Sequence, residues 1–302
     1  MKIALFGSTG FVGQHLLDGL EAEIIPVNIR KIAWESQIPA DVDAFINCIG
    51  KAHDHKNEAG KQDFYFANYD LVKEMFTAFL ESSAKLFIHL SSIAAVEEIS
   101  ADIPLTEDAT SNSTSLYGKS KRKAEEWLLQ QQLPPNKKLI ILRPPMIHGE
   151  GDKGSLKLLY NMVSKGIPYP LAAFENQRSF ITVENVLFFI ERIIENKDNL
   201  ESGIYHIADD EPISTNQIIE IINDVENGNN FKFALPKFLV NALAKIGDMV
   251  SFFPLNSVKL KKMTSNLLVS NQKIKTALKI ENLPLSAEEG LIKTVKSFKS
   301  IR

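Results

Sequence analysis

Lys2-Ile3-Ala4-Leu5-Phe6-Gly7-Ser8-Thr9-Gly10-Phe11-Val12-Gly13 opens the chain and predicts a strand, a glycine turn and the start of a helix. The apolar run ends at Gly7, and apolar residues then recur at helical spacing as far as Leu20. Glycines in such a turn let the backbone approach a pyrophosphate, whose charge the free amides at the helix start attract. This context predicts dinucleotide binding; the alternative is a plain strand-to-helix turn.

The same alternation of strands and helices continues along the chain. Apolar runs predict parallel strands over 23–27, 43–50, 85–90 and 139–142, and helical periodicity covers 64–82 and 115–132. The pattern weakens after residue 152 into helices joined by short strands, one of them over 203–208. We therefore expect an α/β fold, with a dinucleotide-binding domain over 1–152 and a smaller, mainly substrate-binding domain over 153–302 that returns some elements to the main sheet.

Composition excludes several classes of protein. The 302 residues are 44% hydrophobic and carry a formal net charge of -3, so the cationic field of a nucleic-acid binder is absent. The first apolar run is too short for a signal peptide or a membrane span, which predicts a cytoplasmic protein. A single cysteine, Cys48, excludes an intrachain disulfide, and His53 and His55 lie in a polar loop where solvation is the simpler interpretation. No metal is expected.

The end of the second strand bears on the choice of cofactor. An acid at this position reads a free ribose 2'-hydroxyl, and a base accommodates a 2'-phosphate. The sequence offers Asn28-Ile29-Arg30-Lys31, with no carboxylate and two cations. This favours NADP over NAD. In the alternative, both cations are surface charges and Asn28 bonds the ribose of NAD.

A hydroxyl, a phenol and an amine follow at positions suited to chemistry at a carbinol carbon. Ser91-Ser92 closes the strand over 85–90, and Tyr117 and Lys121 lie four residues apart in a helical run, on one face. A lysine ammonium near a phenol favours the phenolate, so the pKa of Tyr117 should be lowered. Taken alone, such a pair also occurs by chance on many helices.

Several motifs now stand in an order that resembles the extended short-chain dehydrogenase/reductases, and most closely their NAD-dependent epimerase/dehydratase branch. They are the glycine turn, Asn68 in Phe66-Ala67-Asn68-Tyr69, Ser92, Tyr117-Gly118-Lys119-Ser120-Lys121, Arg143-Pro144-Pro145 and the run from Arg178 to Val186. The resemblance covers nearly the whole chain. It implies a Rossmann-type doubly wound parallel sheet with a smaller mixed α/β substrate domain on the C-terminal side.

The resemblance also implies roles for individual residues. Tyr117 would be the acid/base, Lys121 would lower its pKa and hold the nicotinamide ribose, and Ser92 would orient the reacting oxygen, with Ser91 as its substitute. Asn68 would brace Lys121. The implied contacts to NAD or NADP are Gly7, Thr9, Gly10, Phe11, Val12, Gly13, Asn28, Arg30, Cys48, Ile49, Gly50, Asn68, Ser91, Tyr117, Lys121 and Pro144, and those to substrate are Lys51, Ser92 and Arg178.

Departures from the family pattern narrow the reaction. Dehydratases of this family place an Asp-Glu pair after the hydroxyl residue, whereas this chain has Ile93-Ala94, and Cys48 lies too early for a second proton-shuttling pair. The family resemblance then favours a nucleotide-sugar 4-epimerase. An NADPH-dependent 4-keto-sugar reductase and a non-catalytic dinucleotide-sensing protein remain the alternatives. The substrate would be a diphosphate-linked sugar, on a nucleotide or a polyprenyl carrier.

Two further expectations concern surfaces. The stretch 234–254 is unusually apolar and is interrupted by Lys237, Lys245 and Asp248. Core packing or a subunit contact is the simpler interpretation, and peripheral contact with a membrane is the other. The resemblance implies a homodimer that packs the helices over 64–82 and 115–132 against those of its partner.

Overall fold

A computed structural model describes residues 1–52, 60–228, 234–249 and 255–300. Its centre is a sheet of six parallel strands in the order β2-β1-β3-β4-β6-β9. The strands are β1 (Lys2–Phe6), β2 (Glu23–Val27), β3 (Ala44–Asn47), β4 (Leu86–Leu90), β6 (Lys138–Arg143) and β9 (Gly203–His206). The expected doubly wound parallel sheet is confirmed, and β9 joins it from the second half of the chain.

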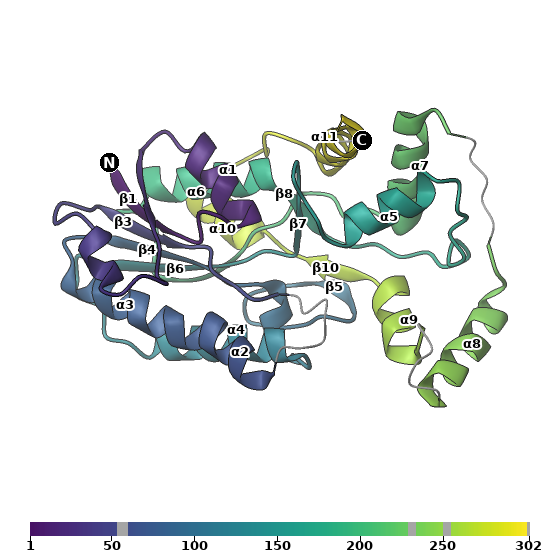
Figure 1. Cartoon of the computed structure of the whole chain (residues 1–302), viewed down its shortest axis with the longest axis horizontal. Helices are drawn as coiled ribbons and strands as arrows, with labels where there is room; N and C mark the ends of the chain where they lie inside the picture. The colour runs from purple at the N-terminus through teal and green to yellow at the C-terminus, as the bar shows by residue number, and fades with distance from the viewer. Residues whose placement is uncertain (53–59, 229–233, 250–254, 301–302) are drawn as a thin grey trace.

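Helices cover both faces of this sheet (Figure 1). One face carries α1 (Phe11–Gly19), α6 (Val183–Glu195) and α10 (Gln272–Leu278). The other carries α2 (Lys61–Tyr65), α3 (Leu71–Glu81) and α4 (Leu116–Leu129). Two helical layers are required because the strands of a parallel sheet are apolar on both sides.

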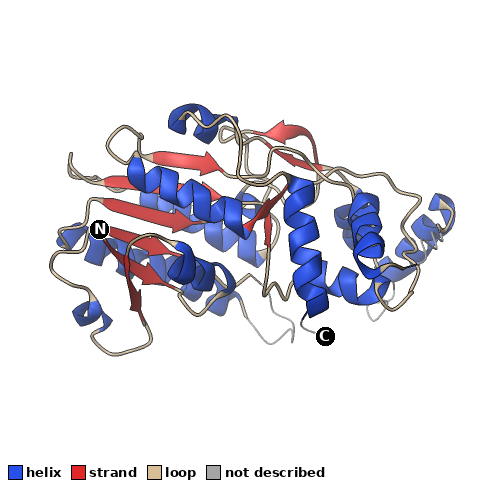
Figure 2. Cartoon of the chain, turned by 90° about the horizontal axis from the view of Figure 1, so that it is seen from above, coloured by secondary structure: helices blue, strands red, loops and turns tan. Residues whose placement is uncertain are grey.

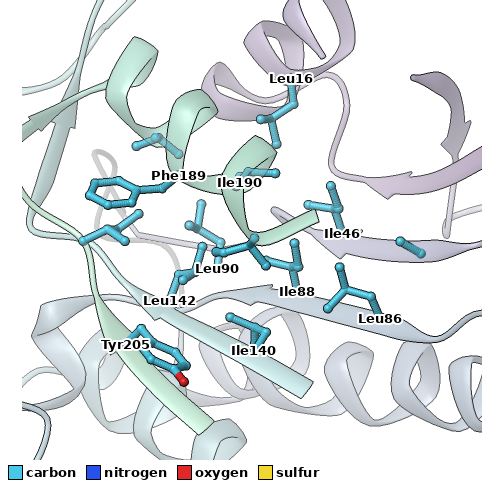
Figure 3. Close-up of a cluster of buried hydrophobic side chains, with 14 of the residues drawn as sticks. Leu16, Ile46, Leu86, Ile88, Leu90, Ile140, Leu142, Phe189, Ile190 and Tyr205 are labelled. Atoms are coloured by element: carbon cyan, nitrogen blue, oxygen red, sulfur yellow. The ribbon is translucent and has the colours of Figure 1, made fainter. Parts of the chain in front are cut away.

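Each sheet face has its own apolar core. Leu16 of α1 and Phe189 and Ile190 of α6 pack with Ile88 and Leu142 of the strands, as Figure 3 shows. The opposite core is aromatic and consists of Phe6, Phe45, Phe76, Phe79 and Phe87 with their aliphatic neighbours. Each fully buried side chain of this size contributes about 1.5–3 kcal/mol, so the two cores fix the sheet between its helices.

The strand order reverses between β1 and β3. The chain moves outward from β1 to β2 and then returns to pair β3 with the other side of β1. In open α/β sheets, ligands bind outside the carboxyl ends of the strands at such a point. Gly7 follows β1 and Cys48 follows β3, so both residues lie at this crevice.

A second lobe lies beyond the carboxyl edge of the sheet (Figure 2). Its core packs α5 (Ser155–Val163), α7 (Thr215–Glu226) and α11 (Ala287–Ser300), and its far end holds α8 (Lys237–Met249) and α9 (Ser257–Thr264). Two small parallel sheets connect the lobes, β7 (Met146–His148) with β8 (Phe180–Thr182), and β5 (Ala101–Leu105) with β10 (Leu267–Val269).

Two predicted helices differ in detail from the sequence pattern. The run expected over 64–82 consists of α2, a π-helical turn (Phe66–Asp70) and α3. The helix expected over 115–132 is α4, which Ser115 caps by accepting a hydrogen bond from the Gly118 amide. Short 3-10 turns cover Trp34–Gln37 and Ile93–Ala95. No helix in the described ranges is long and apolar enough to cross a bilayer.

Candidate active site

The glycine turn after β1 packs closely against the first turn of α1, where Gly13 leaves no room for a side chain. Gly7 has φ +84°, a conformation that favours glycine, and a Cβ on residue 13 would overlap the Gly7 carbonyl oxygen. Gly10 begins α1 without a side-chain cap, so the first amides of the helix are available for an anion. The turn, including Thr9, Phe11 and Val12, therefore fits the pyrophosphate of a dinucleotide.

Lys121 is buried at the carboxyl edge of the sheet, with 2% of its surface exposed. Its Nζ donates hydrogen bonds to the carbonyl oxygens of Leu90, 2.8 Å away at the end of β4, and of Ile49, 3.3 Å away after β3. Burial lowers the pKa of Lys121 from its usual value to about 8. The lysine thus joins α4 to the strand ends beside the crevice, next to Gly50.

Ser92 and Tyr117 are brought together by close packing of α4 on the turn after β4. Gly118 allows this, because a Cβ there would overlap the Ala94 carbonyl oxygen. A hydrogen bond links the side chains of Ser92 and Tyr117, and the Pro144 carbonyl accepts from the Ile93 amide at 2.8 Å. The structure therefore joins Ser92, rather than Ser91, to the tyrosine.

The ionisation of Tyr117 differs from the sequence-based expectation. Burial raises the pKa of the phenol, the Ser92 hydrogen bond opposes this shift, and the charges of Glu98 and Glu125 add to it. Lys121 directs its described hydrogen bonds to backbone carbonyls instead. The expected lowering of the Tyr117 pKa by Lys121 is thus wrong, because desolvation is the largest influence on the phenol and raises its pKa.

Glu125 is a site residue that the sequence reasoning missed. It forms a buried ion pair with Arg143, in which Nε donates to Oε1 at 2.9 Å and Nη2 donates to Oε2 at 2.7 Å. Ser91 donates its hydroxyl to the same Oε1 at 2.5 Å. The pair therefore joins α4 to the ends of β4 and β6. Two features of the sequence indicate this pair. Arg143 is a charged residue at the end of an apolar strand, and Glu125 lies four residues after Lys121 on the same helical face.

Asn68 lies in the π-helical turn and is fully buried. Its amide exchanges hydrogen bonds with the backbone of Lys51 at 2.8 and 3.1 Å, and donates to the Ser120 hydroxyl at 2.9 Å. The hydrogen bonds of Asn68 thus go to Lys51 and Ser120, the sequence neighbours of Gly50 and Lys121, and not to the lysine ammonium. The turn redirects the helix so that this amide faces inward, as π-helical turns often do at functional sites.

The end of β2 has the features expected of a ribose-reading turn. The Asn28 side chain accepts from the Arg30 amide at 3.1 Å, which forms a tight turn. Arg30 and Lys31 are exposed beside it. Both cations are therefore available at the mouth of the crevice.

Arg178 lies in the second lobe and contacts α9. Its Nη1 donates to the carbonyl oxygens of Lys262 at 2.9 Å and Ser265 at 3.2 Å. The nearby carboxylate of Glu184 pairs with Lys293. Arg178 thus holds the C-terminal end of α9, and burial lowers its pKa.

Metal ligands were not expected, and the part of the chain that the structure describes holds no group of three histidine, cysteine or acidic residues suited to an ion. His53 and His55 lie outside the described residues. Burial raises the pKa of the Cys48 thiol to about 12, so this cysteine stays protonated.

Comparison with known proteins agrees with this geometry. The model of the NAD dependent epimerase/dehydratase family matches residues 3–208. A UDP-glucose 4-epimerase of Vibrio cholerae is 23% identical, over 98% of this chain and 95% of its own. An N-acetyl-alpha-D-glucosaminyl-diphospho-ditrans,octacis-undecaprenol 4-epimerase of Escherichia coli O157:H7 is also 23% identical, over 98% and 94%.

Solved structures share the fold along the whole chain. A UDP-glucuronic acid 4-epimerase from Bacillus cereus, in complex with UDP-glucuronic acid and NAD, superimposes with a TM-score of 0.77 at 17% identity, over 100% of both chains. RMD from Pseudomonas aeruginosa, in complex with NADPH, gives a TM-score of 0.76 at 17% identity, over 99% of both. The chain belongs to the NAD-dependent epimerase/dehydratase family.

The buried ion pair should show strong coupling in stability. Replacing one partner, in Glu125→Leu or Arg143→Met, should cost about 3–5 kcal/mol because it leaves the other charge buried and unpaired. The double variant should recover most of that loss. Urea unfolding of all four proteins measures the coupling. The exposed pair Arg122–Glu126 on the same helix is the control, and Glu126→Gln should cost less than about 1 kcal/mol. Additive losses would contradict the assignment.

Lys121 should make stability depend on pH. Its pKa is about 8 in the folded chain and near 10.5 when unfolded, so between these values the unfolded chain binds more protons and stability rises with pH. The Lys121→Met variant should lack this rise, which amounts to roughly 3 kcal/mol at most. Urea unfolding from about pH 7 to about pH 10 tests it. Lys123→Met, at an exposed position of the same helix, should keep the wild-type slope.

Proposed function

We propose that this protein is a nicotinamide-dependent 4-epimerase that acts on a diphosphate-linked sugar. The observation that carries the proposal is the hydrogen-bonded pair Ser92–Tyr117, which lies one helical turn from the buried ammonium of Lys121 at the carboxyl edge of the sheet. This geometry suits proton transfer at a hydroxyl oxygen while hydride leaves or returns at its carbon.

The residues of the crevice fit a dinucleotide. The glycine turn offers free amides to the pyrophosphate, and Lys121 lies close enough to the strand ends to hold a ribose there. When bound, the nicotinamide supplies a reversible two-electron oxidant for the carbinol carbon. The protein's own part is to bind and orient the sugar and to move the hydroxyl proton.

Tyr117 would carry that proton without a second acid. Ser92 would orient the reacting oxygen. Tyr117 would take the C4 hydroxyl proton as the phenolate, a form that the positive charge of an oxidised nicotinamide would favour against desolvation, and would return the proton after the sugar has presented its other face. The nearby carboxylates are occupied, since Glu98 accepts hydrogen bonds from Ser115 and Glu125 pairs with Arg143. Ile93 and Ala94, directly after Ser92, are apolar and buried, which disfavours dehydration.

Substrate binding is assigned to both lobes. Arg178 would meet the diphosphate from the second lobe and Lys51 would approach the sugar from the strand side. Both the nucleotide-linked substrate of the V. cholerae relative and the undecaprenol-linked substrate of the E. coli relative present a diphosphate. We also propose that the active form is a homodimer whose interface consists of α2, α3 and α4. We expect it to act in the cytoplasm. The boundary between the dinucleotide-binding and substrate-binding domains is proposed to lie near residue 152.

A second candidate is an NADPH-dependent 4-keto-sugar reductase, which would use the same three side chains. Exposed Arg30 and Lys31, with no acid after β2, favour it because they suit a 2'-phosphate. A non-catalytic dinucleotide-sensing protein would not require the Ser92–Tyr117–Lys121 arrangement, which argues against that class.

Removing the phenol should abolish turnover while sparing the fold. Tyr117→Phe should lower kcat by at least about 100-fold, because general acid/base catalysis contributes 10²–10⁴-fold. The rate of interconversion of UDP-linked hexoses measures it, with cofactor fluorescence titration to show that binding is kept. The control is Tyr205→Phe, which removes one hydroxyl bonded to the Glu201 carbonyl and should leave activity unchanged. Undiminished activity in Tyr117→Phe would refute the catalytic assignment.

Cofactor identity separates the two candidate reactions. An epimerase should copurify with tightly bound cofactor and need none added, whereas a reductase should consume NADPH in step with a keto sugar.

If Arg30 binds a 2'-phosphate, Arg30→Ala should weaken NADPH binding about tenfold or more and leave NADH binding unchanged, since a charged hydrogen bond contributes about 1.5–3 kcal/mol. Arg192→Ala, an exposed arginine of α6, is the matched control. Equal loss for both cofactors would contradict the NADP preference.

A further inference from the structure

Helix α8 has two apolar faces, and the part of the chain that the structure describes covers one of them. Val240, Ala244 and Gly247 are buried, and the first two pack with Leu171 and Leu260. Their spacing of four and three residues is that of one helical face. The inward face therefore accounts for the packing of α8 on the rest of the second lobe.

The second apolar face points outward. Phe238, Ala242, Ile246 and Met249 recur at intervals of four, four and three residues, so they line one stripe. At 3.6 residues per turn this stripe lies roughly 170° around the helix from the buried face. Phe238 is 76% exposed, Ile246 50% and Met249 88%. A stripe of large apolar side chains on the surface is unusual in a monomer and marks an interaction site.

Lysines lie beside this stripe and on the neighbouring helix α9. Residues 234–265 contain five lysines and one acid, Asp248, although the chain as a whole carries a net charge of -3. Asp248 accepts hydrogen bonds from the backbone and hydroxyl of Ser257 at the start of α9. Lys245 lies beside the stripe, and Lys261 and Lys262 are exposed on α9. This end of the second lobe thus carries net positive charge next to an exposed apolar helical face.

We propose that α8 and α9 dock the protein on an anionic lipid bilayer, with the stripe inserted at the interface and the lysines against the headgroups. An apolar helical face flanked by lysines fits such a surface, and each lysine near it contributes about 1 kcal/mol. A second copy of the chain fits less well, because a two-fold contact through the stripe would bring the lysines of both copies together.

The position of the helices agrees with this surface. α8 and α9 lie at the end of the molecule opposite the N-terminus, on the side away from α1 (Figure 1). Arg178 holds the carbonyl end of α9, so docking would place the interface next to the region assigned to the substrate diphosphate. This last point rests on the proposed function, whereas the docking surface itself does not.

Vesicle flotation tests the docking surface without any need for activity. The protein should float with vesicles of phosphatidylcholine and phosphatidylglycerol at low salt, and bind at least about tenfold less to phosphatidylcholine alone or at high salt. The variant Phe238→Ser/Ile246→Ser/Met249→Ser should lower partitioning by more than about tenfold. Lys261→Gln/Lys262→Gln should lower it about tenfold, but only for the anionic vesicles.

Two controls distinguish the outcomes. Leu158→Ser removes an equally exposed apolar side chain from α5 and should float like the wild type. The stripe variant should keep wild-type turnover of a substrate in solution, since its residues lie outside the catalytic group. Flotation that survives the stripe substitutions, absence of binding to anionic vesicles, or a wild-type dimer that the stripe substitutions dissociate would each overturn the proposal. Loss of activity in Tyr117→Phe bears on the reaction alone.

Discussion

The sheet edge proposed as the active site depends on buried charges, each of which has a hydrogen-bonding partner. Arg143 at the end of β6 and Glu125 of α4 form a two-bond ion pair with almost no exposure, and Ser91 at the end of β4 donates to the same carboxylate. A buried charge without its partner is costly, so this contact sets how α4 lies across two strands. The positions of Tyr117 and Lys121 on α4 follow from it.

Desolvation dominates the electrostatics of the proposed site. It raises the pKa of Tyr117, lowers that of Lys121 and raises that of Cys48, in each case favouring the neutral form. The lysine therefore serves first as a donor to the Leu90 and Ile49 carbonyls, which anchor the helix to the strand ends. A bound dinucleotide would alter this balance, because its charges would enter the same crevice.

The two lobes contribute different parts of the proposed site. The sheet and its helices position Ser92, Tyr117 and Lys121, while the second lobe presents Arg178 and the lysine-rich α8 and α9. Arg178 links α9 to the proposed substrate site. It donates hydrogen bonds to carbonyl oxygens at the C-terminal end of α9, and the substrate diphosphate is proposed to bind beside it. The small sheet of β5 and β10 ties this lobe to the scaffold.

The sequence by itself determined the parallel sheet, the glycine turn, the helices on both faces and the Tyr117–Lys121 pair, because each follows from spacing within a short window. It did not predict β5, whose partner β10 is distant along the chain, or the π-helical turn that directs Asn68 inward. Only the tertiary structure decided that Ser92 meets Tyr117, that Glu125 pairs with Arg143 and that Arg178 binds α9 rather than a nearby glutamate. Those outcomes depend on contacts between distant segments and on burial, which shifts a pKa or selects a partner in ways that residue spacing does not encode.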